Sequence, residues 1–465
     1  MRSHHRSSAA PRLGSLVVAV SLVVGCAGSA TNQTGGAASK GDATDLSNIT
    51  AAQLKGTTLQ MSRFFGDCND TTQGVTDVTK AKTECEVIQI LTNAFNANNE
   101  FGIKVERLGG AVWNTYYDAL NAAFASGNPP DVAVMHGSNL PDYAARKLLL
   151  PLDKPLAAAK VDIGDAAKPA REAVTYDGTT YAVPFDIHAN LVHVNIDLFK
   201  AAGLVDAAGK AKLPTSVDEF FSEAKQIKDK TGKQFIGGDF VEGPNGVRVL
   251  MALANQQDIE LVSGDGKTIK VDSPESRKAL DVLLRSFNEG YANPKQTYDA
   301  AQQAFLRGDM ALLINGTWVV NQYTSEATFA YQAADFPTLF KTPATWANSH
   351  IWAIPQQKSA DPVKYRAGIE FMKYLYSHED AWALSTGHLA ARTSVLGSPE
   401  FTSAPQRANY AETAKSIAHE APRVRNWQAV EDILKHQIEG TWLAGTPPDQ
   451  ALKEAQRQVE QQLAK

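Results

Sequence analysis

The chain lacks several features that define common protein classes. After its first 25 residues it has no apolar run of about 18 or more residues, so no further membrane span is expected. Acidic residues outnumber basic ones, 50 to 45, which argues against nucleic acid as a partner because phosphate binding needs a basic surface. The sequence has no Gly-x-Ser-x-Gly, His-Glu-x-x-His or phosphate-loop motif, and no repeat of about 20 to 50 residues. These absences disfavour the common hydrolase classes, phosphate-loop enzymes, solenoids and propellers.

The first residues have the pattern of an export signal. Arg2, Arg6 and Arg12 precede an apolar stretch at 13–24, which ends in Val23-Val24-Gly25-Cys26. A dozen apolar residues are too few to cross a bilayer of about 30 Å as a helix. The sequence Val-Val-Gly-Cys resembles a bacterial lipobox, in which the cysteine is lipidated and becomes the new N-terminus. We therefore predict a lipoprotein signal peptide at 1–25 and lipidation of Cys26.

Residues 26–56 have the composition of a flexible tether. The segment is rich in Ala, Gly, Ser and Thr and buries little apolar surface, so it is expected to stay mobile. Acyl chains on Cys26 would hold the protein at the outer face of the bacterial cytoplasmic membrane. Removal of the signal takes away three arginines and leaves 42 basic against 50 acidic residues, a net charge of about −8.

Two of the three cysteines remain after Cys26 is assigned to the anchor. Cys68 and Cys85 are 17 positions apart and have no other thiol or imidazole nearby at zinc-ligand spacing. In an exported protein an isolated pair most simply forms a disulfide. A disulfide between Cys68 and Cys85 is therefore predicted.

The body after residue 56 alternates between strand and helix patterns, which is typical of α/β layers with a mostly parallel sheet. Its length after signal removal, 440 residues, favours two domains. In such sheets ligands bind at the carboxyl ends of strands, which nominates the loops that start at Phe65, Gly109 and His136. The expected strands are 57–65, 103–108, 131–135, 191–194 and 235–236, and the expected helices are 86–95, 113–125, 217–230, 247–255, 276–289 and 447–465.

Several segments, in order along the chain, resemble the bacterial extracellular solute-binding proteins that serve sugar importers of the ATP-binding-cassette (ABC) type. The matching segments are Pro130-Asp131-Val132, Tyr181-Ala182-Val183-Pro184, Val194–Leu204, Pro214–Phe220, Phe305–Leu312, Asn315-Gly316-Thr317-Trp318 and Gly387-His388-Leu389 with Arg392. Two positions depart from the family pattern: Ser216-Val217 replaces a tryptophan environment, and Ala390 replaces a proline.

This resemblance implies a two-lobed α/β clamshell of the type II, maltose-binding-protein-like class, with the ligand in a cleft between the lobes. The chain would cross between the lobes about three times, first near Phe185–Asn190 and second near Phe336-Pro337. One lobe would hold 57–185 and 338–395, and the other 190–335 and 396–465. The protein would be a monomer that captures a carbohydrate or polyol and delivers it to an ABC permease, without a cofactor.

Candidate ligand contacts follow from loop positions and from the resemblance. Tryptophans would stack on sugar rings, carboxylates and amides would accept hydrogen bonds from hydroxyls, and arginine or histidine would donate. Trp318 and Trp113 are the candidate stacking residues, and Arg392 is the candidate arginine donor. The other candidates are Phe65, Asp67, His136, Ser138, Asn139, Asp186, His188, Asp239, Glu242, Asn348, Ser349 and His350.

Other functions are weighed against this one. His136, His188 and His350 all fall on expected cleft loops, so they would suit a metal ion, or a phosphorylated solute such as a glycerophosphodiester with help from Arg392. Imidazoles serve equally well as neutral partners for hydroxyls, and we favour that interpretation, with no metal site. A secreted glycoside hydrolase would need two facing carboxylates, for which Asp186 with Glu242 or Asp239 are candidates. A display or adhesion scaffold without a small ligand is a further alternative.

Overall fold

The computed structural model of the protein describes residues 44–109 and 113–465. The predicted signal peptide, the predicted lipidation site Cys26 and the tether up to residue 43 lie outside these ranges. Within the described ranges, every helix is too short or too polar to span a lipid bilayer.

The first sheet is built mostly from the N-terminal part of the chain. Its strands β1, β2 and β3 run parallel, whereas β12 pairs antiparallel with β3 and with β6. Leu59, Val105 and Val134 contribute to its core, together with Trp352. The strand order is β2 (Lys104–Arg107), β1 (Thr58–Ser62), β3 (Val132–His136), β12 (His350–Ala353) and β6 (Ala182–Pro184).

The second sheet is centred on one long strand, β7. All ten residues of β7 are buried, and the strand pairs antiparallel with β9, β10, β11 and β13. A separate small hairpin joins β4 (Thr175–Tyr176) to β5 (Thr179–Thr180). The order is β14 (Ala418–Glu420), β11 (Thr345–Asn348), β7 (Asp186–Asn195), β9 (Met310–Gly316) and β8 (Gln234–Gly237), with β10 (Tyr331–Ala334) and β13 (Leu389–Ala390) also paired to β7.

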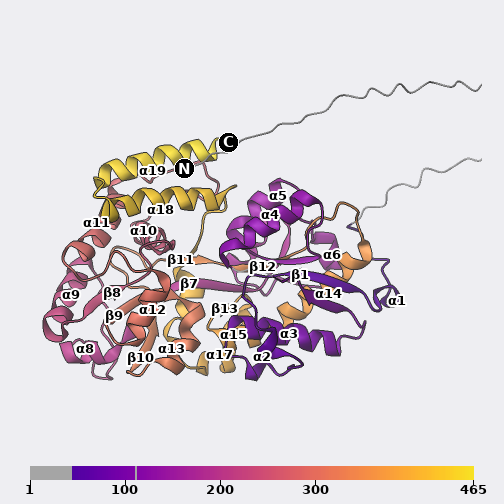
Figure 1. The fold of residues 1–465 in the computed structure, drawn as a ribbon, viewed down its shortest axis with the longest axis horizontal. Helices are drawn as coiled ribbons and strands as arrows, with labels where there is room; N and C mark the ends of the chain where they lie inside the picture. Colours follow the sequence, from indigo (N-terminus) through magenta and orange to yellow (C-terminus); the bar gives the residue numbers. More distant parts are fainter. Residues whose placement is uncertain (1–43, 110–112) are drawn as a thin grey trace, which may run out of the picture. The chain divides into compact units, whose positions relative to one another are not determined.

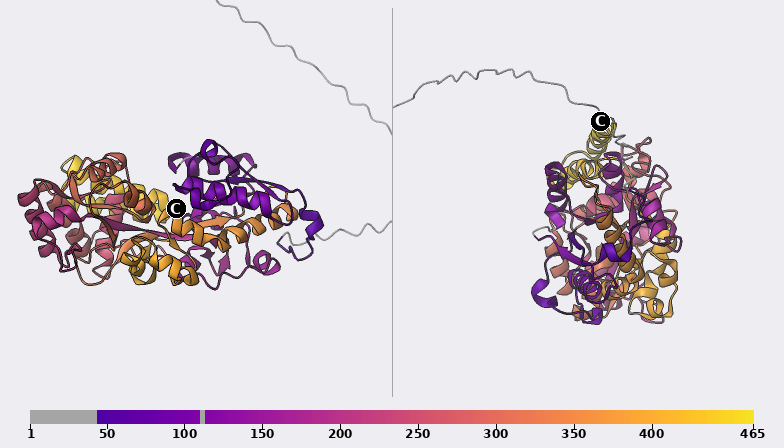
Figure 2. Two further views of the ribbon diagram at one scale, coloured as in Figure 1. Left: turned by 90° about the horizontal axis from the view of Figure 1, so that it is seen from below. Right: turned by 90° about the vertical axis from the view of Figure 1, so that its right-hand side faces the viewer.

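Helices cover each sheet and form two lobes with separate main cores (Figures 1 and 2). Around the first sheet lie α1 (Ala51–Leu54), α2 (Asn69–Thr72), α3 (Glu84–Asn98), α4 (Tyr116–Ser126), α5 (Leu140–Ala145), α6 (Asp153–Ala158), α14 (Pro362–Ser377) and α15 (Glu379–Thr386). With the second sheet lie α8 (Ile196–Ala202), α9 (Val217–Thr231), α10 (Asn245–Asn255), α11 (Pro274–Asn288), α12 (Tyr298–Leu306), α13 (Val320–Glu326), α18 (Trp427–Leu443) and α19 (Pro448–Leu463). A smaller third core takes in α7 (Lys168–Ala173), α16 (Thr393–Leu396) and α17 (Pro399–Ser403).

Short turns of 3₁₀ and π helix connect these elements. They are η1 (Val78–Lys80), η2 (Trp113–Thr115), η3 (Gly137–Asn139), η4 (Thr317–Val319), η5 (Arg407–Asn409) and the π turn η6 (Thr413–Ile417).

Helix α9 illustrates how the local sequence sets an element. The hydroxyl of Ser216 accepts a hydrogen bond from the backbone N–H of Glu219 and so caps the first turn. Phe220, Ala224 and Ile227 repeat at helical spacing, and all three are buried in the second core. The helix ends at Gly232, whose φ of +67° favours glycine. The predicted helix at 217–230 corresponds to this element.

The chain crosses between the sheets at two places that can be compared with the expected ones. The first passage, from β6 to β7, falls at Phe185, within the expected region. The second was expected near Phe336-Pro337, but the structure places it at Ser349, between β11 and β12. The buried side chain of Gln256 explains the difference, because it hydrogen-bonds to Pro337 O, Ala344 O and Leu339 N and keeps this segment with the second lobe.

The segment 396–465, which was expected to belong to the second lobe, divides between two cores. Buried residues of α18 and α19 belong to the second core, where 396–465 was placed. Leu389, Val395 and Phe401 instead pack in the third core, against Ile187 and Leu191 of β7. Residues near 395 therefore join a cluster beneath β7, and no clean boundary between the lobes falls there.

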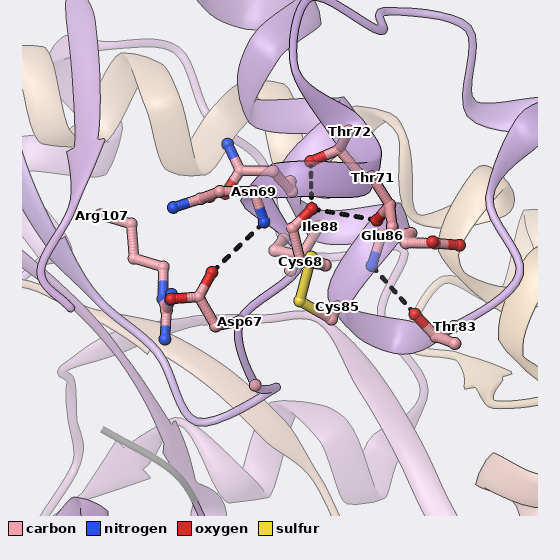
Figure 3. Close-up of a disulfide and its surroundings, with 12 residues drawn as sticks. Asp67, Cys68, Asn69, Thr71, Thr72, Thr83, Cys85, Glu86, Ile88 and Arg107 are labelled. Carbon is pink, nitrogen blue, oxygen red and sulfur yellow. Dashed lines mark hydrogen bonds and ion pairs between the residues drawn. A yellow bond between two sulfur atoms is a disulfide. The ribbon is translucent and has the colours of Figure 1, made fainter. Parts of the chain in front are cut away.

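The predicted disulfide is present. Cys68 and Cys85 are bonded, with their Cα atoms 6.0 Å apart, and the link ties the loop after β1 to the first turn of α3 (Figure 3). The guanidinium of Arg63 lies against it, with Nη1 3.4 Å from the sulfur of Cys85. Arg63 also donates to Gln89 Oε1 and to the carbonyl of Gly66, which holds the loop in place.

Candidate functional site

Asp186 is fully buried where the chain enters β7, and it accepts four hydrogen bonds. Its Oδ1 accepts from His188 Nδ1 at 3.2 Å and from the backbone N–H of His350 at 3.0 Å. Its Oδ2 accepts from His350 Nδ1 at 2.7 Å and from Trp382 Nε1 at 2.8 Å. Burial opposes ionisation, but electrostatic interactions with His350 and His388 and the hydrogen bonds from the imidazoles of His188 and His350 outweigh it, so the pKa of Asp186 lies well below its ordinary value. Asp186 is therefore a buried carboxylate that holds the side chains of His188, His350 and Trp382 in place.

Four imidazoles surround this carboxylate: His136, His188, His350 and His388, which with Asp186 we call the histidine cluster. The rings of His188 and His350 stack at 4.1 Å, and His136 lies 5.0 Å from His350. Burial lowers the pKa of His188 to about 4, and it lowers the pKa values of His136 and His388 well below the ordinary value. These three rings are therefore neutral at neutral pH, and each offers one donor and one acceptor.

Strand periodicity explains how β7 supplies two of these groups. Successive side chains of a strand point to opposite faces, so Asp186 and His188 share one face while Ile187 and Ala189 share the other. The second pair packs in the third core. His350 arrives from β12, whose register pairs it with His136 on β3.

Aromatic side chains from both lobes flank the histidine cluster. Trp113 is 48% exposed, and its ring meets His136 edge-on at 4.7 Å. From the second lobe, the Trp318 ring lies 6.0 Å from His188, and its Nε1 donates to the hydroxyl of Tyr298 at 2.8 Å. Sites for small polar ligands commonly combine large, partly exposed aromatic rings with buried polar groups.

Phe65 approaches the histidine cluster from the loop after β1. Its ring contacts His350 edge-on at 5.2 Å and Trp382 at 5.0 Å. The neighbouring Phe64 stacks on His136 at 4.7 Å. This loop is the one that the Cys68–Cys85 disulfide restrains.

Polar residues at the second passage form a further network beside the histidine cluster. Asn348 Nδ2 donates to Ser138 Oγ at 2.9 Å, and Ser349 Oγ donates to Glu420 Oε1 at 2.9 Å. Asn139, next to Ser138, lies in the turn η3 that follows β3. Burial raises the pKa of Glu420 to about 8, so its protonated form is favoured in the fold. The side chains of Ser138, Asn348 and Ser349 therefore hydrogen-bond within the protein, beside the second passage of the chain.

The second lobe adds a buried cation and a buried acid. The guanidinium of Arg248 lies 3.7 Å from the ring of Trp346, and His188 lies 5.9 Å from the same ring. Burial raises the pKa of Asp239 to about 6, against the opposing charge of Arg248. Asp239, one of the expected contacts, thus lies on the second-lobe side of the site.

Three expected contacts are engaged elsewhere. Asp67 pairs with Arg107 at 2.8 Å in the disulfide loop (Figure 3), and Arg392 Nε pairs with Asp165 at 3.1 Å. Glu242 is exposed on a loop, where its backbone has a φ of +70°. None of the three has a direct contact with the histidine cluster among the described residues. In each case a local partner or a solvated loop accounts for the side chain.

The structure also places residues near the cluster that the sequence did not single out as contacts. They are Glu84, Trp346, Trp382, Arg248 and His388. His388 stood inside the Gly387-His388-Leu389 motif, so a signal was present there. Glu84 opens α3, directly before a disulfide cysteine, and its sequence surroundings resemble those of an ordinary helix start.

A cavity of about 420 Å³ lies beside β14, away from the expected contacts. It is lined by residues including Lys168, Glu172, Met251, Glu420 and Arg423. None of the predicted ligand contacts lines it, although Glu420 links it to the crossing through Ser349.

Comparison with known proteins agrees with this architecture. The family model described as bacterial extracellular solute-binding protein matches residues 91–409, more than half of the chain. The diacetylchitobiose binding protein DasA of Streptomyces coelicolor is 24% identical over 80% of this chain and 86% of its own length. The lactose-binding protein of Rhizobium radiobacter is 26% identical, but the match covers 42% of this chain and less than half of that protein, 44%.

Among solved structures, the GacH receptor of Streptomyces glaucescens, described unliganded and with acarbose, has the same fold. It superimposes with a TM-score of 0.74 at 20% identity, over 88% of this chain and 99% of that one. The fold is thus the expected α/β, maltose-binding-protein-like type II architecture. The protein belongs to the bacterial extracellular solute-binding protein family.

Proposed function

We propose that this protein captures a carbohydrate or polyol between its two lobes and delivers it to the permease of an ABC importer. The observation that carries the proposal is the pairing of exposed or half-buried aromatic rings, Trp113 from one lobe and Trp318 from the other, around neutral imidazoles. Rings stack on the apolar faces of sugars, and imidazoles exchange hydrogen bonds with hydroxyls. The names of the relatives, which bind lactose and diacetylchitobiose, support the same class of solute.

The proposed cycle depends on closure of the lobes. A solute that contacts both lobes binds the closed state better than the open state and shifts the equilibrium toward closure. A shift from about 1% to about 99% closed needs about 5.5 kcal/mol of differential affinity. The closed monomer would then be the form that the permease recognises.

A neutral solute is favoured over a phosphorylated one. Three of the four imidazoles are held neutral by burial, so they do not bring the positive charge that a phosphate group favours. Arg248 is cationic, but it lies over Trp346 and faces Glu431, with Nε 3.9 Å from Oε1, so its charge is already balanced. A glycerophosphodiester stays the alternative solute that the binding screen includes.

The same geometry disfavours a glycoside hydrolase. Asp186 was one candidate carboxylate for such an enzyme, but it is fully buried and its oxygens accept four hydrogen bonds from the protein, so neither oxygen is accessible to a solute in the cleft. A nucleophile or general acid needs such an accessible oxygen. We therefore propose a receptor without turnover.

A direct experiment is a thermal-unfolding screen of the purified protein with mono- and disaccharides, chito-oligosaccharides, polyols and glycerophosphodiesters, followed by calorimetry and product analysis. Reversible stabilisation by a sugar or polyol without product supports the proposal. Stabilisation by phosphodiesters alone supports the alternative solute, and product formation supports an enzyme. Absence of any response would leave a display scaffold as the better explanation.

We also propose that the protein is exported and anchored by lipid on Cys26. The basic start, the short apolar run and the cysteine after Gly25 support this proposal, as does its membership of an extracellular family. Replacing Cys26 with alanine should move the protein from the membrane fraction of a bacterial host to the soluble fraction. Retention in the membrane, with no labelled acyl chain on the wild-type protein, would refute the anchor.

A further inference from the structure

Four buried side chains from both lobes place potential metal ligands close together. One ligand atom from each of Asp186, His188, His350 and His388 lies within 4.8 Å of every other. Asp186 and His188 belong to β7 of the second sheet, His350 belongs to β12 of the first sheet, and His388 directly precedes β13. All four residues are buried, with at most 5% of their surface exposed. Such a cluster is unlike the exposed acidic groups that are common on protein surfaces.

The hydrogen bonds of His388 determine which of its ring nitrogens carries a proton. The Thr386 hydroxyl donates its single proton to the carbonyl of Trp382 at 2.6 Å. The contact of 2.9 Å between Thr386 Oγ1 and His388 Nδ1 must therefore have Nδ1–H as its donor. In the neutral ring, Nε2 then carries a lone pair and no proton.

That lone pair faces oxygen atoms. His388 Nε2 is fully buried and makes no hydrogen bond to any described residue, yet it lies 3.3 Å from Glu84 Oε1 and 3.9 Å from Asp186 Oδ2. Two carboxylate oxygens and a nitrogen lone pair at these distances repel one another unless a cation lies between them. A metal ion would turn this repulsion into three attractive contacts, and an extra proton is the competing explanation.

The donor atoms select the kind of ion. Imidazole nitrogen with carboxylate oxygen is the donor set of Zn²⁺ and related divalent transition metals, whereas Ca²⁺ and Mg²⁺ take mainly oxygen. Zinc-to-ligand bonds of about 2.0–2.2 Å place ligand atoms ~3.4 Å apart, so the side chains would close in by about 1 Å on binding.

We propose that Asp186, His188, His350 and His388 bind one divalent transition-metal ion of the Zn²⁺ class at the junction of the two sheets, with Glu84 beside it. The ion joins ligands from β7, β12 and the segment before β13, so it links the two passages of the chain to each other. It occupies the buried end of the site, behind the rings of Phe65 and Trp382. This inference does not depend on which solute the protein captures.

The test uses the full chain without an affinity tag, with His4 and His5 replaced by alanine in every protein compared, so that no N-terminal imidazole binds metal. After dialysis against chelator, ZnCl₂ is titrated by calorimetry, and Co²⁺ is added to record its ligand-field absorption. We expect one equivalent of Zn²⁺ to bind and raise the unfolding temperature, Co²⁺ to give bands of nitrogen and oxygen ligation, and Mg²⁺ and Ca²⁺ to have no effect. His388→Gln should weaken Zn²⁺ binding by about 10- to 100-fold or more.

Two comparisons keep this test decisive. His436→Gln, at an exposed position on α18, should leave Zn²⁺ binding unchanged. As a second readout that does not depend on the folding of His388→Gln, crystals of the unaltered protein soaked in Zn²⁺ should show an anomalous peak among the four ligands. Absence of that peak, or equal Zn²⁺ affinity in the His388→Gln variant, would overturn the proposal and favour the extra proton. Sugar binding that persists in chelator would leave the proposed function intact.

Discussion

The carboxylate of Asp186 on β7 accepts a hydrogen bond of 2.7 Å from Nδ1 of His350 on β12, so one buried contact joins the two sheets. The backbone N–H of His350 donates to the other oxygen of the same carboxylate at 3.0 Å. The residue next to the second passage is thus fixed by both its backbone and its side chain. This pair, together with the hydrogen bonds between Ser138 and Asn348, fixes one lobe relative to the other.

Replacing Asp186 with asparagine should therefore destabilise the fold strongly. The amide NH₂ would face N–H groups that now donate to a carboxylate oxygen, and buried donors would lose their acceptor. We expect a loss of about 3 kcal/mol in the free energy of unfolding, measured in urea. Asp229→Asn, which breaks an exposed pair with Lys225, should cost less than about 1 kcal/mol. Equal effects of the two changes would contradict the role assigned to Asp186.

Removing the ring of Trp318 should weaken solute binding without unfolding the protein. The half-buried indole lies beside His188 and is held by the Tyr298 hydroxyl. We expect Trp318→Ala to raise the Kd for the captured sugar by about 10- to 100-fold, measured by calorimetry. Leu443→Ala, at another exposed apolar side chain, on α18, serves as the control and should leave the Kd unchanged. An unaltered Kd in Trp318→Ala would remove this ring from the binding site.

The half-buried acid Glu420 should make stability depend on pH. Its folded-state pKa of about 8 lies above the ordinary value of about 4.3, so folding favours the protonated form. Its contribution is fully present below about pH 4.3 and is lost as the pH rises through about 8. The Glu420→Gln variant keeps an acceptor for Ser349 and lacks the titration.

The measurement compares urea unfolding of the wild type and Glu420→Gln at several pH values. The wild type should lose stability relative to the variant as the pH rises from about 4.5 to about 8.5. A constant difference between the two proteins across this range would show that Glu420 titrates normally. Taking the difference cancels the opposite pH dependence of the buried histidines, which both proteins share.

The disulfide should stabilise the fold chiefly through the unfolded chain. Its loop spans a sequence separation of 17 residues, for which chain entropy predicts about 3 kcal/mol. We expect the double variant Cys68→Ser/Cys85→Ser to lose about this much in urea unfolding. Dithiothreitol should lower the stability of the wild type and leave the double variant unchanged. Equal sensitivity of both proteins to the reductant would rule out this explanation.

The fold was largely predictable because the local hydrophobic patterns agreed with the packing of the whole protein. The unbroken apolar run at Val132–Met135 and the helical spacing of Phe220, Ala224 and Ile227 correspond to β3 and α9. The second passage was misplaced, because Phe336-Pro337 has the appearance of a boundary. The interaction that keeps this segment in the second lobe comes from Gln256, a distant polar residue with no local signature.

Part of the histidine cluster could be anticipated from the expected crossing and from the family resemblance. Asp186 and His188 were selected at the expected first crossing and His350 from the family resemblance, and the structure brings the three together, while their contact with a solute stays a prediction. Arg392 fits the family pattern, but its ion pair with Asp165 depends on a contact across more than two hundred positions of sequence. Glu84 and His388 meet the other groups only through tertiary packing, which no single-sequence pattern records.

A single residue, Ser349, separates β11 in one sheet from β12 in the other. So short a connection does not allow the two sheets to slide along each other. The proposed opening of the lobes would then be a swing about this connection, close to the histidine cluster. Groups beside this connection would keep their arrangement throughout the swing, while the rings of Trp113 and Trp318, which come from opposite lobes, would separate and approach with each cycle.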